Sequence, residues 1–232
     1  IIPFTENEAR QLFELESTWA KREPWPGDAT WNTESRMLAA LREMRDMQPP
    51  PLLIANHPSR SALGFGQYGI DDPAELRGWN DTAPNVAVGM AGAPGHQAAT
   101  LLPDGTVSAE RRARGGYGNY PTHGGFDQMT AMVGGFWDSM IGEGRDWWIT
   151  ANSDSHVHYS EGGSDFWPGE YSKTFVWAQK NHESIMDGIR NGRIFVTTGD
   201  LIDQLFVSAE SNQSGTTAEI GGTLTVAAGD SV

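Results

Sequence analysis

The chain of 232 residues contains no cysteine. This absence excludes disulfides, zinc sites built from thiolates, and cysteine nucleophiles. Any metal ion must therefore be bound by histidine, carboxylate or amide side chains, or by water. A lack of cysteine is compatible with the cytosol, the periplasm and the extracellular medium, so it does not define the compartment.

Basic residues are also scarce, because 16 Lys and Arg stand against 30 Asp and Glu and leave a formal net charge of -14. This balance argues against binding to a nucleic-acid backbone or to an anionic membrane surface, both of which require clustered basic side chains. No apolar run approaches the roughly 18 residues of a membrane-spanning helix. No signal peptide is visible, but the chain begins at Ile1, which indicates a processed or incomplete segment. We expect a soluble protein, with a periplasmic or extracellular location slightly favoured over the cytoplasm.

Helical and extended patterns alternate along most of the chain. Apolar stripes at helical spacing predict helices over residues 5–22, 33–47, 126–141 and 182–191, the third interrupted by two glycines. Short apolar runs predict buried strands over residues 52–55, 86–90, 147–151, 174–178 and 193–198. The alternation predicts an α/β domain over 1–203 with a mainly parallel sheet or barrel. Residues 204–232 predict the start of a small β-sheet unit, with strands over 205–208 and 223–227.

The most informative segment is Trp147–His158, an apolar run that favours a strand and ends in one carboxylate and two imidazoles. Asp154, His156 and His158 are two residues apart, so an extended backbone places them on one face. A carboxylate and neutral imidazoles directed at one point are suitable ligands for a divalent transition metal. The alternative is a polar loop after a buried strand, whose histidines only make hydrogen bonds.

Two further histidines follow predicted strands. His57 comes directly after the strand at 52–55, and it faces the same rim as Asp154 if the two strands are parallel in one sheet. His96 follows the strand at 86–90 and is a further candidate metal ligand, although the glycines before it leave its position open. Arg60 is close to His57, and a guanidinium at such a rim would suit a phosphate or another oxyanion, with an ordinary salt bridge as the alternative.

Three segments resemble, in the expected order, motifs of the PHP (polymerase and histidinol phosphatase) superfamily of metal-dependent phosphoesterases. Leu53–Pro58 resembles the strand that ends in an (Ala/Asn)-His-Pro ligand motif. Ala151–His156 resembles the late Ser-Asp-x-His motif. Ile189–Gly199 resembles the ending R-x-G-R-x-F-V-T-x-G. Each motif is short, but the ordered set is fairly specific.

The resemblance implies a distorted (β/α)7-like barrel with up to three divalent ions (Zn, Mn or Fe) at its C-terminal rim. It implies hydrolysis of a small-molecule phosphate ester by a metal-bound hydroxide. By the same resemblance, His57, Asp154 and His156 are metal ligands. We further predict that His96 and His158 lie at the metal rim, and that Arg60 and His158 help to bind the phosphate.

The sequence departs from the family pattern near its start. The family begins with a His-x-His motif followed by another His and a Glu, and no His-x-His pair precedes His57 here. An acidic residue expected near Ala91 is also absent. Either an N-terminal segment precedes this sequence, which the start at Ile1 favours, or part of the metal cluster has been lost. Two other functions stay open: a metal-binding module without catalysis, and a metallohydrolase of another ester or amide.

Overall fold

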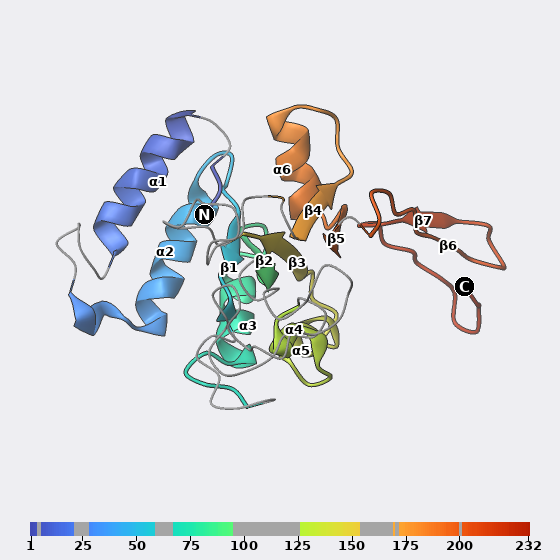
Figure 1. Cartoon of the computed structure of the whole chain (residues 1–232), viewed down its shortest axis with the longest axis horizontal. Helices are drawn as coiled ribbons and strands as arrows, with labels where there is room; N and C mark the ends of the chain where they lie inside the picture. The colour runs from blue at the N-terminus through green and yellow to red at the C-terminus, as the bar shows by residue number, and fades with distance from the viewer. Residues whose placement is uncertain are drawn as a thin grey trace.

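A computed structural model describes residues 1–3, 6–20, 28–58, 67–94, 126–153, 169, 172–199 and 201–232. This part of the chain is mixed α/β (Figure 1). Its helices are α1 (Glu6–Trp19), η1 (Ala29–Trp31), α2 (Glu34–Asp46), α3 (Pro73–Thr82), α4 (Gln128–Ala131), α5 (Phe136–Ile141) and α6 (His182–Arg190). Its strands are β1 (Leu53–Ala55), β2 (Ala87–Pro94), β3 (Trp148–Asn152), β4 (Ser172–Val176), β5 (Ile194–Thr198), β6 (Ser208–Glu210) and β7 (Thr217–Glu219).

The central sheet contains three parallel strands in the order β1-β2-β3. Ala55 pairs with Met90, and Pro94 pairs with Asn152. The strands therefore point their C-terminal ends the same way, and we call the ends of β1, β2 and β3 at Ala55, Pro94 and Asn152 the carboxyl edge. The α3 crossover between β1 and β2 must run back against the strand direction, because the two strands are parallel.

A second sheet, the antiparallel pair β4-β5, lies beside β3 (Figure 1). Hydroxyl side chains join the two sheets: Ser172 Oγ donates to the carbonyl of Ala93 at 3.1 Å, and Thr174 Oγ1 donates to the carbonyl of Ala151 at 3.1 Å. Because Ser172 pairs with Thr198, β4 begins and β5 ends near the carboxyl edge.

Two apolar clusters lie on opposite faces of the central sheet, as expected when successive strand residues alternate in direction. The larger cluster packs Leu53 against α2, α3 and α5 and includes Trp147, which is fully buried. The smaller cluster packs Leu52 and Trp148 against Met186 of α6. Buried side chains on both faces explain why the strands appear in the sequence as nearly continuous apolar runs.

The C-terminal residues form a hairpin, β6-β7, at one end of the molecule (Figure 1). The segment just before the hairpin contacts Trp177, whose indole N–H donates to the carbonyl of Leu205 at 3.2 Å and whose ring packs on Phe206 with centroids 4.8 Å apart. The predicted strand over 223–227 is wrong. The turn at Ser211–Thr216 closes the hairpin earlier, with Ser211 N–H donating to the Thr216 carbonyl at 2.9 Å.

The predicted single helix over 126–141 is also wrong, since α4 and α5 are separate. Gly134 has φ 80°, and a Cβ on Gly135 would lie 2.0 Å from the Met129 carbonyl oxygen, so the chain turns at these two glycines. The other expected helices and strands of 1–203 agree with the structure to within a few residues. The predicted barrel and the domain boundary at 203 stay predictions. None of the helices in the described ranges is long and apolar enough to span a bilayer.

Candidate functional site

His57 is the predicted site residue that falls within the described ranges. It follows β1 at the carboxyl edge and is partly buried. Its φ is 33°, and among the described residues it is the non-glycine residue with positive φ. A left-handed backbone costs an L-residue about 1–2 kcal/mol, and such strain is concentrated at functional sites. The remaining predicted residues lie outside the described ranges: Arg60, His96, Asp154, His156 and His158.

The ends of three distant segments meet at the carboxyl edge. β1 leads directly into His57, β3 ends at Asn152 just before the Asp154 motif, and β5 ends at Thr198. β1 and β3 flank β2, and Ala55 is level with Ile149, three residues before Asn152, so the two strand ends are about 14 Å apart. Thr198 joins them because it pairs with Ser172, which bonds to the end of β2. The fold thus brings to one edge strand ends that are far apart in sequence, with Ala55 and Thr198 separated by 143 residues.

The end of β3 is held rigidly. Ser172 Oγ is buried and lies 3.1 Å from the Ala93 carbonyl and 3.5 Å from the Asn152 carbonyl, so one hydroxyl links the ends of β2 and β3. Thr174 Oγ1 accepts a hydrogen bond from the Ala151 N–H at 2.8 Å and also contacts the Ala151 carbonyl. A site built on such fixed strand ends positions its side chains more precisely than a site on loops alone.

The donors at the carboxyl edge fit a divalent metal in chemical type. His57 offers an imidazole nitrogen, and Asn152 offers an amide oxygen, Oδ1, that is inaccessible to solvent and has no hydrogen-bond partner in the described part. An unsatisfied buried acceptor costs about 1–3 kcal/mol, which a cation or donor at this position would offset. Within the described ranges no group of three or more His, Asp or Glu side chains is placed to hold a metal ion. The fit therefore rests on the type of donor, and the remaining predicted ligands are outside those ranges.

Asp127 is a buried carboxylate near β2 that sequence reasoning missed. Its N–H donates to the Gly92 carbonyl at 2.7 Å, and its Oδ1 accepts from the Met129 N–H at 2.8 Å, so it caps α4. The residue is only 1% exposed. An Asp two residues before the amide that it caps is a usual N-terminal helix signal. The sequence analysis predicts that the helix begins at residue 126, which places Asp127 inside the helix rather than at its capping position.

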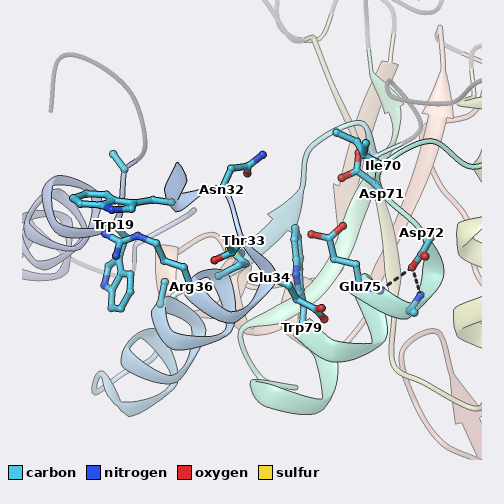
Figure 2. Close-up of a pocket in the computed structure, with 15 residues that line it drawn as sticks. Trp19, Asn32, Thr33, Glu34, Arg36, Ile70, Asp71, Asp72, Glu75 and Trp79 are labelled. Atoms are coloured by element: carbon cyan, nitrogen blue, oxygen red, sulfur yellow. Dashed lines mark hydrogen bonds between the residues drawn. The ribbon is translucent and has the colours of Figure 1, made fainter. Parts of the chain in front are cut away.

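A separate pocket with a volume of about 810 Å³ lies between the N-terminal ends of α2 and α3 (Figure 2). Its described walls contain tryptophans and carboxylates: Trp19, Trp31, Trp79, Glu34, Asp71, Asp72 and Glu75. No predicted site residue is among these lining residues. The pocket therefore neither supports nor opposes a metal site at the carboxyl edge.

The charge distribution in this pocket is uneven. At one end the Arg36 guanidinium stacks between Trp31 and Trp19, 4.0 Å and 4.8 Å from the two ring centroids. At the other end, burial and then the charge of Asp71 raise the pKa of Glu75 to about 7, and Glu34 and Asp72 add to this rise. Carboxylates and aromatic rings together favour cations. Arg36 already occupies the cation position between the rings of Trp19 and Trp31.

Comparison with known proteins adds no relative: no protein-family model matches the sequence, and searches of curated proteins and of solved structures return no match.

Proposed function

We propose that this protein is a metal-dependent phosphoesterase of the PHP superfamily, with a distorted (β/α)7-like barrel over residues 1–203, that hydrolyses a small-molecule phosphate ester. One observation carries the proposal. Strands β1, β3 and β5, each of which lies within or leads into a segment that resembles a family motif, end at the carboxyl edge although they are far apart in sequence. In α/β folds this edge is where parallel strands usually place ligands and catalytic groups.

Each predicted residue has a role in this proposal. His57, Asp154 and His156 hold divalent ions, and His96 and His158 complete or border the metal rim. The left-handed turn at His57 redirects the chain as it leaves β1. Arg60 binds and orients phosphoryl oxygens through its fork of N–H donors. When bound, the ions would make water nucleophilic near neutral pH and neutralise charge on the phosphoryl group.

The proposal is tested by metal analysis together with ester hydrolysis. We expect about two or three Mn, Fe or Zn ions per chain and turnover of an aryl phosphate. Asp154→Ala and His156→Ala should lower metal content and abolish turnover. His182→Gln is a matched control, because His182 contacts the Pro3 carbonyl at the start of α6 and is not one of the predicted site residues. It should leave metal content and turnover unchanged.

The outcomes separate the proposal from its alternatives. A chain with one metal or none that is inert on all esters would refute it. Stoichiometric metal without turnover would indicate a binding module that has lost catalysis. Comparison of aryl phosphate mono-, di- and triesters with carboxyl and sulfate esters would reveal a metallohydrolase of a different substrate class. Full activity after Asp154→Ala or His156→Ala would show that the assigned residues are wrong.

A further inference from the structure

Asn152 combines a fixed backbone with an unpaired, enclosed side-chain oxygen. Its carbonyl lies 3.5 Å from Ser172 Oγ, and the preceding residue is held through Thr174. Strand alternation places Asn152 on the same face of the sheet as Trp148, whose indole N–H donates to the Arg190 carbonyl at 3.1 Å. Its Oδ1 has no hydrogen-bond partner in the described part and no exposure to solvent.

Neighbouring hydroxyls do not satisfy this oxygen. Ser172 Oγ is directed at the Ala93 and Asn152 main-chain carbonyls, and Thr174 Oγ1 is engaged with Ala151. Buried side-chain acceptors in native proteins nearly always have a partner, and a ligand is one explanation when the protein supplies none. The unpaired oxygen lies two residues before Asp154, at the end of the strand that carries the late motif.

We propose that Asn152 Oδ1 is an oxygen ligand of a divalent cation at the carboxyl edge, additional to the residues that the motifs carry. The inference rests on the proposed function. An amide oxygen is a hard, neutral donor that suits Mn²⁺ and similar ions. Because it adds no negative charge, it binds the cation without weakening the ion's pull on other ligands as a further carboxylate would.

The test is a Mn²⁺ titration, followed by the electron paramagnetic resonance signal of free Mn²⁺, on metal-free wild-type protein and variants. Asn152→Leu removes the oxygen and keeps the branched arrangement of side-chain heavy atoms, and we expect Mn²⁺ to bind about tenfold more weakly or worse. The melting temperature of metal-free Asn152→Leu should equal or exceed that of the wild type, because no hydrogen bond is lost. Asn152→Asp keeps an oxygen in place and should bind Mn²⁺ at least as tightly as the wild type.

Thr130→Val is the matched control. Like Asn152 Oδ1, Thr130 Oγ1 is a buried oxygen without a hydrogen-bond partner in the described part. Thr130 lies in α4, against Gly92 and Ile149. Ile149 packs on the cluster that faces α2 and α3, so Thr130 is on the opposite face of the sheet from Asn152. Its replacement should leave Mn²⁺ affinity unchanged.

Two results would overturn the inference while the proposed function stands. One is wild-type Mn²⁺ affinity in Asn152→Leu when Asp154→Ala abolishes binding. The other is a lower melting temperature of metal-free Asn152→Leu, which would indicate a structural partner for the amide. A wild-type protein that binds no Mn²⁺, Fe²⁺ or Zn²⁺ would instead remove the proposed function, and this inference with it.

Discussion

Gly192 offers a direct test of how α6 packs on the central sheet. It follows α6 with φ 67°, and a Cβ at this position would lie 2.6 Å from Cε2 of the Trp148 ring. Alanine there incurs two costs: about 1–2 kcal/mol for a left-handed L-residue, and about 1–3 kcal/mol for overpacking against the indole. Gly192→Ala should therefore lower the free energy of unfolding by about 2–5 kcal/mol.

Gly144→Ala supplies the control for the backbone cost. Gly144 has φ 73°, and nothing lies within 4 Å of an added Cβ, so only about 1–2 kcal/mol should be lost. Urea denaturation followed by far-ultraviolet circular dichroism measures both variants, and their difference isolates the contact with Trp148. If Gly192→Ala loses no more stability than Gly144→Ala, the indole does not lie on Gly192 and the described packing of β3 against the end of α6 is incorrect.

Three further predictions concern titration and the link between the sheets. Glu75→Gln should flatten the pH dependence of stability between pH 4.5 and about 7 and raise the melting temperature above pH 7. Burial and Asp71 raise the pKa of Glu75 to about 7, so in this range the folded wild type retains a proton that the unfolded chain loses. The stability of the wild type therefore falls as pH rises through that range. Identical pH profiles for the wild type and Glu75→Gln would contradict this prediction. Arg145→Met should raise the pKa of Asp81, because the guanidinium donates to that carboxylate at 2.6 Å and holds its pKa below 3.8. Carbon-13 NMR titration should show the rise, and the wild type should lose more stability than the variant as pH falls below about 4; an unmoved Asp81 titration would refute the contact. Ser172→Ala should cost about 1 kcal/mol in urea denaturation through loss of the hydrogen bond to β2, and an unchanged midpoint would show that this bond contributes nothing.

Much of the secondary structure could be predicted from the sequence because its causes are local. Apolar runs identify β1, β3 and β5, and the apolar stripe and following glycine identify α6. Gly134-Gly135 marks the break between α4 and α5 in the sequence, but whether the helix ends there depends on how closely Gly135 approaches the Met129 carbonyl. The extension of β2 to Pro94 likewise depends on its partner β3, because the residues from Ala91 onward carry no strong strand pattern of their own.

The candidate site, too, could be predicted from the sequence only in part. The chemical character of His57 could be read from its position after an apolar run. Its left-handed backbone could not, because φ is set by how the chain leaves the packed strand. The hydrogen bond from Ser172 to β2 and the burial of Asp127 could not be predicted from the sequence either, because both depend on contacts with β2. Ser172 and its partner Ala93 are 79 residues apart in the chain.

The sequence by itself determined most of the segments of 1–203 that become strands and helices, which of them end in ligand-type side chains, and which metal chemistry the absence of cysteine permits. These properties follow from side-chain type and short-range periodicity. Only the tertiary structure decided that β1, β2 and β3 run parallel, that β4 turns back beside β3, and that β5 ends at the same edge as His57 and Asn152. Strand order and direction arise from long-range burial and hydrogen bonding, and a local pattern does not encode them.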